Sequence, residues 1–569
     1  MDRASNRRRI DLIDATPGTA VQRRWPVPFW RRIIVLIVFV AAAAALGYMI
    51  RHQWFYYDEW AYLDPQVEGP GKSFLAWLFI PHNEHTIVWT KLWFQISFRA
   101  VGLHHYWVYA IPLLASVLAA GYAAYVLMRR LGGSQALALV GVVPFLFMGA
   151  GAQDLVWAGQ FQFVLPVALF LGWLALDISG HLPTRLWARI AVPIAWSLAG
   201  ALSSLVWIPL ALVLTVRSLI LRQWWYAALL TTVPALIWGI SRVKYPHTSS
   251  SGYAANGIVE YLRLIPRYIW VGVVSPFTTT VHSSLGGTIL VVLAGLSVLV
   301  FLRAGLRSLV TAAALAVAAP MFLMVTGYAR LALGPEQAAA SRYSYVVLAC
   351  LLPLLVAAMA RTLRLPRREG KPKLTGLRQP GLLVGVAAVL VFGFFSAMVL
   401  KTYSNKTAVR DRASQRVIQA AADQLAVQSQ DIATNAGFPE PDGAPQLTAL
   451  RLQQWVLAGK VSKKTTPAAA RQATVNLAWT TTRKAAGLIS GTCRVVAGPG
   501  NVAITSATVV SRKGAGAIQL RPPGPSVNQS AVAAHSLPAA GNFVLTPTGS
   551  QRWTAVIGIH AGVTLTLCS

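Results

Sequence analysis

The chain has 569 residues, of which 55% are hydrophobic, and its 50 Lys and Arg against 18 Asp and Glu give a formal net charge of +32. This hydrophobic share exceeds that of an ordinary soluble domain. The positive charge does not indicate a nucleic-acid-binding protein, because the basic residues fall mainly in short segments between long apolar runs. That distribution is typical of a protein that crosses a membrane several times.

The polar and basic residues 1–31 precede the first apolar run. A polar stretch of this length, with no convincing small-residue cleavage site after the run, argues against a cleaved signal peptide. We therefore expect 1–31 to be a cytoplasmic N-terminus and the run to be a retained membrane anchor.

Apolar runs long enough to cross a bilayer continue to residue 400, and they predict a polytopic α-helical membrane domain over 32–400. We expect about eleven spans, at 32–50, 107–128, 135–151, 160–178, 187–202, 203–220, 223–241, 286–302, 308–327, 343–360 and 381–400. Lys and Arg favour the cytoplasmic side of a membrane. Placing the N-terminus inside puts the basic segments, such as 361–379, inside as well. The outer segments are then 51–106, 151–159, 242–285, 328–342 and everything after 400.

The first outer segment, 51–106, contains two stretches that resemble interfacial helices. The stretch 84–102 is apolar on one side and carries Lys91 and Arg99, which argues against a membrane span. We expect it to be an amphipathic helix lying at the outer membrane surface. A second such helix is expected at 72–80.

Two adjacent acids open this outer segment, in the sequence "WFYYDEW" at 54–60. Burial near a membrane raises the pKa of a carboxylate, which suits a general base. A carboxylate there can also bind a divalent cation such as Mg²⁺ or Mn²⁺ through oxygen. Asp58 and Glu59 are therefore the candidate catalytic residues or metal ligands, and the sequence does not separate them. The alternative is a pair of ordinary solvated acids. Most of the aromatic neighbours are expected to form an interfacial belt.

The sequence "HNEH" contributes His82, Glu84 and His85. On a helix, the two histidines would share a face and supply half of a metal site. A zinc site is not expected, because no second such cluster exists. A hydrogen-bonding role beside Asp58 is favoured.

Asp154 lies in the short outer segment that follows the third span, and Gln160 begins the next span. Polar residues at this depth are costly unless they line a cavity. They indicate a polar pocket, or alternatively helix capping by Asp154.

Several Arg and Lys residues and one Tyr on the outer side are candidates for binding a phosphate group. A guanidinium binds phosphate through a fork of donors. The alternative is a side chain that contacts ordinary phospholipid. The candidates are Arg342, Tyr343, Arg330, Lys244, Arg263 and Arg267.

The tail 401–569 predicts an extracytoplasmic domain. Residues 405–430 have the pattern of an amphipathic helix, and six short β-like runs follow, separated by Gly, Pro and Ser. Cys493 and Cys568 would lie on the oxidising side of the membrane, so we expect a disulfide between them, the alternative being two free thiols. Cys350 lies in a span, where a packing role is expected.

This pattern resembles the GT-C superfamily of membrane glycosyltransferases. The resemblance rests on the "YYDEW" acids in a long first outer loop, on "NEH", on an outer "SRY" near the last spans and on an extracytoplasmic tail. It covers about residues 30–400. It implies an enzyme that transfers a sugar from a polyprenyl-phosphate donor to a glycan or lipid acceptor, with inversion, on the outer face of a bacterial plasma membrane.

In this family, the acid that opens the first outer loop is the candidate base or metal ligand, a position that Asp58 or Glu59 matches. The cation for the donor phosphate matches Arg342 loosely. The tail has no "WWD" motif, which argues against protein N-glycosylation. The Ala, Val, Arg and Gly content is typical of a GC-rich actinobacterium, in which such enzymes build cell-envelope polysaccharide.

Three other functions fit parts of the pattern. A lipid-linked glycan ligase or polymerase would also use outer Arg and His residues. A transporter is disfavoured, because most ionisable residues lie at the outer edge rather than in the middle of the spans. A non-catalytic scaffold with a glycan-binding tail would tolerate substitution of both Asp58 and Glu59.

Overall fold

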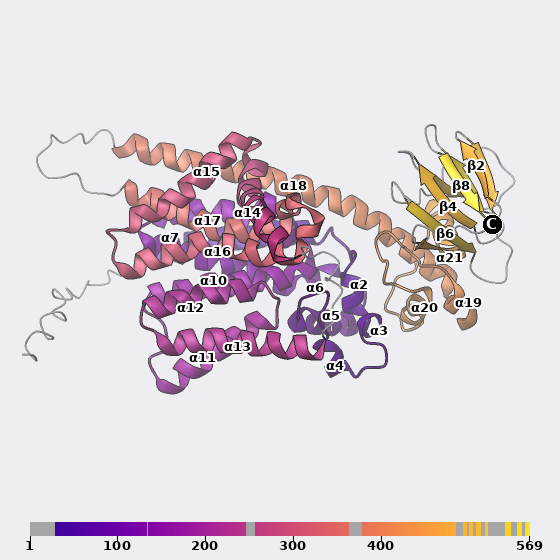
Figure 1. The fold of residues 1–569 in the computed structure, drawn as a ribbon, viewed down its shortest axis with the longest axis horizontal. Helices are drawn as coiled ribbons and strands as arrows, with labels where there is room; N and C mark the ends of the chain where they lie inside the picture. Colours follow the sequence, from indigo (N-terminus) through magenta and orange to yellow (C-terminus); the bar gives the residue numbers. More distant parts are fainter. Residues whose placement is uncertain are drawn as a thin grey trace, which may run out of the picture.

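The computed structural model describes residues 29–133, 135–245, 257–363 and 378–484, followed by short strands up to residue 568. Residues 1–28, most of the predicted basic loop 361–379 and several connections in the tail lie outside the described residues. The described chain forms a body of packed helices, a group of short helices at one end of that body, and a tail that carries the strands (Figure 1).

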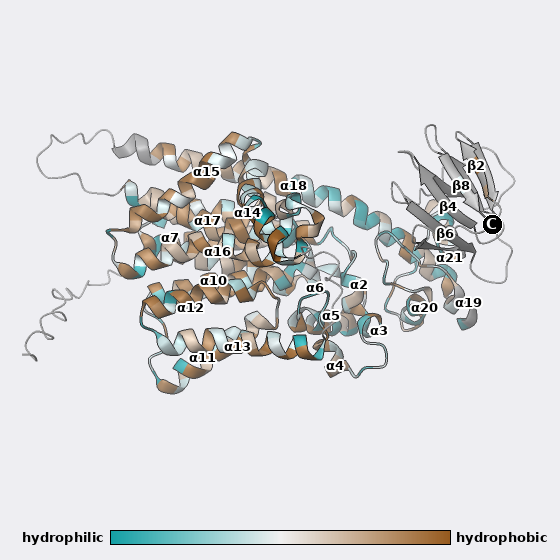
Figure 2. Ribbon diagram, in the orientation of Figure 1, coloured by the Kyte–Doolittle hydropathy of each residue, from teal (hydrophilic) through white to brown (hydrophobic). Residues whose placement is uncertain are grey.

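The body is built from apolar helices that run roughly alongside one another, and hydrophobic residues dominate them (Figure 2). The helices are α1 (Phe29–Ile50), α7 (Ile111–Leu131), α8 (Gln135–Leu146), α10 (Phe161–Ile178), α11 (Leu186–Ala201), α12 (Trp207–Ile220), α13 (Trp224–Lys244), α14 (Ile258–Val281), α15 (Ser284–Ser297), α16 (Leu306–Arg330), α17 (Ser341–Thr362) and α18 (Arg378–Leu425).

Eight helices in the described residues are long and apolar enough to cross a membrane. Three more apolar helices, at Gln135–Gly151, Leu186–Ala201 and Trp207–Ile220, are shorter. They fall at three of the predicted spans, so the sequence overestimated the number of full-length spans. The composition and length of these helices are those of a multi-pass membrane protein.

Helix α17 is the most enclosed of the long apolar helices, since 89% of its most apolar stretch is buried. It packs against α7, α8, α14 and α16. Its first turn carries Arg342 and Tyr343. The centre of the hydrophobic core therefore fixes the position of two predicted site residues.

The predicted outer segment 242–285 is helical for much of its length. Helix α14 occupies Ile258–Val281 and packs against α15, α16 and α17. Two prolines, Pro266 and Pro276, lie inside it. Prolines and charged residues made this stretch resemble a loop, and packing against three neighbouring helices offsets their cost.

Five short helices lie between α1 and α7 and form a cap on one end of the body (Figure 1). They are α2 (Glu59–Leu63), α3 (Pro65–Glu68), α4 (Phe74–Leu78), α5 (Val88–Val101) and α6 (Tyr106–Tyr109). Helices α5 and α4 lie where the sequence predicted its two amphipathic helices.

The expected aromatic belt is wrong for Trp54, Phe55 and Trp60, because all three are buried. Phe55 meets Tyr106 and Tyr109 edge-on, with ring centres 5.1 and 4.7 Å apart. Such edge-to-face pairs stabilise a core. These aromatic residues therefore form the core of the cap and fix the chain just before Asp58.

Helix α18 has 48 residues, which corresponds to a length of about 70 Å. It joins the predicted span 381–400 and the predicted tail helix 405–430 into one helix. Its first half is apolar and its second half is polar, and the second half extends beyond the body (Figure 2). Three short helices follow, namely α19 (Gln430–Asn435), α20 (Ala449–Leu457) and α21 (Pro467–Ala478).

The tail also contains two antiparallel sheets, with strand orders β1-β6-β4-β8-β2 and β3-β7-β5. The pairing of β2 with β8 sets Cys493 opposite Cys568, and Cys493 is disulfide-bonded. The strands are β1 (Trp479–Lys484), β2 (Cys493–Ala497), β3 (Gly500–Ile504), β4 (Thr508–Lys513), β5 (Ile518–Arg521), β6 (Gly541–Pro547), β7 (Ala555–Ile559) and β8 (Thr564–Cys568).

Candidate active site

The two adjacent acids lie at the start of α2 but in different surroundings. The preceding residue, Tyr57, has a φ of 52°, in the left-handed region that bulky residues rarely adopt. Asp58 then forms the N-cap position of α2, and Glu59 is the first residue of the helix. The turn directs the neighbouring carboxylates to different partners.

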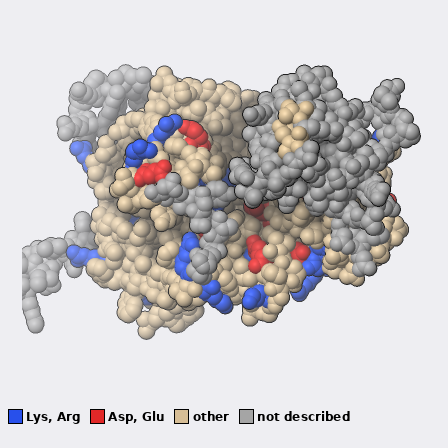
Figure 3. Space-filling model, turned by 45° about the vertical axis from the view of Figure 1, so that its right-hand side comes forward, with Lys and Arg blue, Asp and Glu red and all other residues tan. Residues whose placement is uncertain are grey.

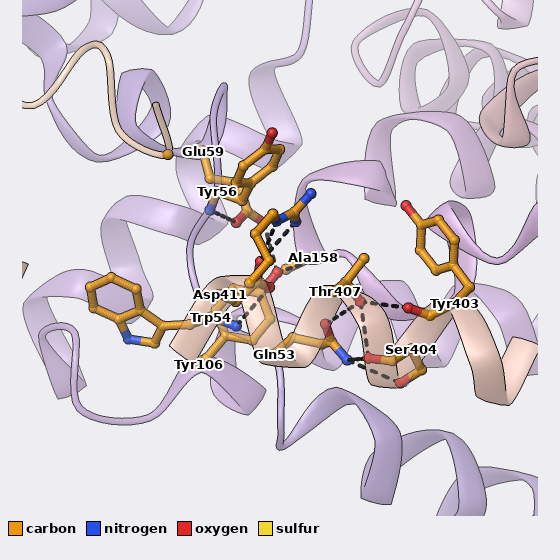
Figure 4. Close-up of polar contacts among 12 residues, drawn as sticks. Gln53, Trp54, Tyr56, Glu59, Tyr106, Ala158, Tyr403, Ser404, Thr407 and Asp411 are labelled. Carbon is orange, nitrogen blue, oxygen red and sulfur yellow. Dashed lines mark hydrogen bonds and ion pairs between the residues drawn. The ribbon is translucent and has the colours of Figure 1, made fainter. Parts of the chain in front are cut away.

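Glu59 is fully buried and accepts three hydrogen bonds. The Tyr106 hydroxyl and the Gly159 amide donate to Oε1 at 2.9 and 2.8 Å, and the Tyr56 amide donates to Oε2 at 3.1 Å. Figure 4 shows Glu59, Tyr56 and Tyr106 in this arrangement. Burial raises the pKa of Glu59 to about 8, against the effect of these donors. Glu59 thus connects the cap to the segment before α10 and has no access to a substrate.

Asp58 remains accessible, with 25% of its side chain exposed. Its Oδ1 lies 3.6 Å from His82 Nε2, the distance of an ion pair. Burial alone would raise the pKa of Asp58, but the interaction with His82 and the positive charges of Arg342 and Arg330 lower it. Asp58 is therefore ionised at neutral pH and faces positive charge.

His82 lies between two carboxylates, those of Asp58 and Glu68. Its Nδ1 is in close contact with Glu68 Oε1. Burial alone would lower the pKa of His82, but Asp58 and Glu68 raise it to about 9. His82 is therefore an imidazolium at neutral pH, and it links Asp58 to the cap.

Glu68 is in turn paired with Lys91, whose side chain is fully buried on α5. Lys91 Nζ lies 2.5 Å from Glu68 Oε2 and donates to the Ile80 carbonyl at 2.8 Å. Burial lowers the pKa of Lys91, and Glu68 opposes this. The four side chains of Asp58, His82, Glu68 and Lys91 thus form one row in which acidic and basic groups alternate. We call this row the acid–base row.

The "HNEH" residues form a tight turn rather than a helix, so His82 and His85 do not share a helical face. The backbone amides and carbonyls of His82 and His85 form two hydrogen bonds with each other. Asn83, between them, has a φ of 52°. Their side chains reach different partners. Within the described residues, no group of three His, Cys, Asp or Glu could hold a metal ion.

Glu84 and His85 lie on a second side of the site. Glu84 pairs with Arg330, at the end of α16, and His85 Nδ1 lies 2.9 Å from the Ser204 hydroxyl. Burial lowers the pKa of His85 to about 4, so the ring is neutral. Glu84, His85 and Tyr343 line a small cavity of about 40 Å³, whose remaining lining is largely apolar.

Asp154 is fully buried at the start of the short helix α9 (Gln153–Val156). Both of its carboxylate oxygens lack a hydrogen-bond partner in the described part of the chain, as do Gln160 Oε1 and Arg342 Nε. Burial raises the pKa of Asp154 well above its usual range, and the charge of Arg342 opposes this. These unpartnered polar groups fit the predicted polar pocket. The alternative was helix capping by Asp154. Its side chain accepts no hydrogen bond from the backbone of α9 in the described residues.

The structure does not bring all six predicted phosphate ligands together. Arg330 and Arg342 act on Asp58 through their charges, and Tyr343 lies beside Arg342, whose guanidinium is 5.2 Å from the ring centre. Lys244, Arg263 and Arg267 are exposed instead, and Arg267 pairs with the exposed Glu336 at 3.0 Å. Charged side chains form only a few groups on the face that Figure 3 shows.

Sequence reasoning missed Glu68 and Lys91. Neither lies in a recognisable motif, and Lys91 was assigned to the polar face of an amphipathic helix. The signal was that a lysine lies among apolar residues on the face of α5 that also carries Phe94. A buried lysine requires a partner, and Glu68 supplies it.

No protein-family model matches the chain, and no curated protein matches it. Solved structures similar to it include ArnT from Cupriavidus metallidurans bound to undecaprenyl phosphate, at 14% identity and a TM-score of 0.44, covering 75% of this chain and 89% of that one. ArnT in the apo state matches with the same identity and TM-score and covers 79% and 92% of the two chains. The proposals below rest on this chain's own residues.

Proposed function

We propose that the protein is a membrane glycosyltransferase that transfers a sugar from a polyprenyl-phosphate donor to a cell-envelope glycan or lipid. The observation that carries the proposal is Asp58, an accessible carboxylate kept ionised beside Arg330 and Arg342. An acid and two cations at the end of a membrane domain suit a reaction that removes a hydroxyl proton and releases a phosphate.

In the proposed reaction, the acceptor oxygen attacks the anomeric carbon of the sugar while Asp58 takes the hydroxyl proton. The bond between the anomeric carbon and the phosphate oxygen breaks, and the polyprenyl phosphate leaves with the electron pair. One displacement of this kind inverts the anomeric carbon. The pKa of Asp58 is lowered and not raised as the sequence led us to expect, so Asp58 is an ionised but weak base. We propose that it takes the proton late, because the hydroxyl becomes acidic as its new bond forms.

Arg342 is proposed to bind the donor phosphate, since a guanidinium presents a fork of donors to phosphate oxygens. Its Nε is buried and has no hydrogen-bond partner among the described residues. Arg330 is already paired with Glu84, so we assign it a supporting charge. Asp154 and Gln160 are as enclosed as Glu59, so we propose that they support the site from behind rather than contact the sugar, and the charge of Asp154 acts on Arg342.

The proposed reaction uses no metal. The groups around Asp58 are His82, Arg330 and Arg342, which bring positive charge rather than further oxygen ligands. Mg²⁺ and Mn²⁺ prefer sites rich in oxygen ligands. The donor set around Asp58 therefore does not fit a divalent cation.

Sugar transfer in vitro tests the proposal. Wild type, Asp58→Asn and Glu59→Gln are purified in lipid and given labelled polyprenyl-phosphate sugars with an envelope-glycan extract, with and without chelator. We expect transfer by wild type, a loss of about 100-fold or more in Asp58→Asn, and no effect of chelator. Glu59→Gln should remain within a few-fold of wild type.

Three outcomes would contradict the proposal. If a broad panel of monosaccharide donors is not consumed, the function is instead ligation of preassembled lipid-linked chains, which the same extract can test. If donors are consumed equally by wild type and Asp58→Asn, Asp58 is not the base. Loss of transfer in chelator would identify a metal requirement that the proposed reaction lacks.

A further inference from the structure

The strained turn before Asp58 is held by a residue from the distant tail. The Tyr57 amide donates to the Gly443 carbonyl at 2.8 Å, and Trp60 Nε1 donates to the same carbonyl at 3.2 Å. These two donors stand on either side of Asp58 and Glu59. A left-handed non-glycine residue persists only where its surroundings fix it. The Gly443 carbonyl supplies that constraint on both sides of the acids.

The second half of α18 holds the chain just before this turn. The Trp54 amide donates to Asp411 at 3.3 Å, and Gln53 Nε2 donates to the Ser404 hydroxyl at 3.0 Å. The Thr407 hydroxyl donates to Gln53 Oε1 at 2.7 Å. Figure 4 shows these contacts between the segment at Gln53 and Trp54 and one face of the helix.

A third set of contacts holds the rest of the cap. Arg451 Nε donates to Asp64 Oδ2 at 2.8 Å, directly after α2. The Leu103 amide donates to the Lys460 carbonyl at 2.8 Å, and Lys460 Nζ donates to the Arg99 carbonyl at 2.8 Å. The tail thus contacts the cap at the beginning of α2, at its end and after α5.

We propose that residues Ser404–Asp411, Gly443 and Arg451–Lys460 form a clamp that holds Asp58 in its reactive position, with Gly443 as the main positioning residue. This inference rests on the proposed function and gives the tail a role in it. Small displacements of a catalytic group cost large factors in rate, so a fixed turn at Tyr57 matters for catalysis.

Gly443 offers a sharp test, because a Cβ atom there would meet Ser414 of α18. It would lie 2.5 Å from Ser414 Oγ and 3.3 Å from Ser414 Cβ. The Ser414 hydroxyl can turn aside, but Ser414 Cβ and Glu440 Cγ, at 3.3 and 3.4 Å, still crowd the new methyl group. Gly443→Ala should therefore shift the loop and its carbonyl relative to Tyr57 by a few tenths of an ångström. Ser414 Oγ is buried and has no hydrogen-bond partner among the described residues. Removing it by Ser414→Ala makes room for the new methyl group at little cost.

The experiment compares full-length wild type, Gly443→Ala, Ser414→Ala and the double variant, each purified in lipid. Hydrogen exchange of residues 54–64 reports the turn without depending on catalysis, and sugar transfer with labelled polyprenyl-phosphate sugars reports kcat and KM. Arg451→Gln is a second, milder variant, because Arg451 is partly exposed.

We expect Gly443→Ala to speed exchange at 54–64 by about tenfold and to lower kcat by about tenfold with little change in KM. Ser414→Ala should behave as wild type, and the double variant should recover both readouts. Arg451→Gln should show the same effects to a smaller degree. If Gly443→Ala does not fold, Arg451→Gln decides.

The clamp is overturned if exchange at 54–64 is unchanged in Gly443→Ala and Arg451→Gln. It is also overturned if exchange rises while kcat stays at the wild-type value, or if the double variant recovers neither readout. Wild type that transfers no sugar contradicts the proposed function instead, and the exchange data then still show whether the tail fixes the turn.

Discussion

Glu59 is the residue whose protonation should be most visible in the stability of the cap. Its pKa is raised to about 8 in the folded protein, from an ordinary value of 4.5, because it is buried. The folded state therefore binds more protons than the unfolded state between these values, and stability falls as pH rises from about 4.5 to 8. The proton responsible is held on the carboxyl group of Glu59, which is fully buried.

Substitution of Glu59 by Gln should remove this pH dependence. We expect wild type to lose thermal stability from pH 5 to pH 8.5, and Glu59→Gln to lose less over the same range, as measured by thermal unfolding in detergent. Glu336→Gln is the matched control, because Glu336 is exposed, and it should follow wild type. Identical slopes in wild type and Glu59→Gln would show that Glu59 is ionised throughout.

The contribution of His82 to stability should also be lost as pH rises, but in a higher pH window. Here the protonated form is the charged one. Its pKa is raised from 6.5 to about 9 by Asp58 and Glu68, against the effect of burial. The stabilisation is fully present below about pH 6.5 and is lost as pH rises through 9. Above that pH, Asp58 also loses its cationic neighbour, so transfer activity should fall together with stability.

His82→Gln tests this by removing the charge while keeping a donor. Between pH 7 and 10 we expect wild type to lose stability and transfer activity, whereas His82→Gln starts lower and loses less of both, its remaining loss of stability below about pH 8 coming from Glu59. His181→Gln, at an exposed histidine, is the control and should keep the wild-type profile. A wild-type profile that remains flat through pH 9 would contradict a charged His82.

At the scale of elements, the acid–base row connects α3 and α5 to Asp58. Lys91 lies on the buried face of α5, and Glu68 ends α3. Removing one member of a buried pair leaves its partner charged and unpaired, which costs about 3 kcal/mol or more. The pair therefore holds the two helices of the cap together and supports His82.

Lys91→Met should lower the free energy of unfolding by about 2 kcal/mol, because Glu68 loses one charged hydrogen-bond partner and keeps only His82. Adding Glu68→Gln should recover part of that loss, since the remaining groups are then neutral. Lys72→Met, at an exposed lysine, should change stability by less than about 0.5 kcal/mol. Unfolding by thermal scan measures all four proteins. Equal effects of Lys91→Met and Lys72→Met would show that the pair carries no stability.

The sequence predicted those elements that have a strong local pattern. The apolar periodicity of 84–102 predicted α5, and the run at 381–400 predicted the first half of α18. It did not predict the full length of α14, because Pro266, Pro276 and several charged residues weaken the pattern there. The helix forms because it packs on three neighbours, which a local pattern does not contain.

The candidate site could be predicted as a region but not as a set of contacts. The "YYDEW" acids pointed to the right turn, yet the different surroundings of Asp58 and Glu59 arise from Gly159 and Tyr106 on one side and His82 on the other. The contact of Gly443 with Tyr57 joins residues nearly four hundred positions apart. Such long-range pairs depend on the packing of the whole chain, and no spacing rule in one sequence reveals them.

At the scale of the whole molecule, the helical body carries the site at one end and a buried ion pair at the other. Helix α10 begins directly after Gly159, which donates to Glu59, and it carries Asp177 near its end. Its length places these two points about 27 Å apart. Asp177 pairs with Arg217 of α12, and Arg217 Nη2 donates to Thr311 of α16 at 2.9 Å. This cluster connects three helices far from Asp58.

Arg217→Met should therefore lower stability without changing the chemistry of each folded molecule. We expect a loss of about 3–5 kcal/mol, because Asp177 remains buried and unpaired, and a partial recovery in Asp177→Asn/Arg217→Met. Arg185→Met, at an exposed arginine, should have little effect on stability. Thermal unfolding measures stability, and transfer per folded molecule, at a temperature where every variant is folded, measures function. A fall in kcat for Arg217→Met under those conditions would show that the two ends of the body are coupled, because a purely local ion pair cannot reach Asp58.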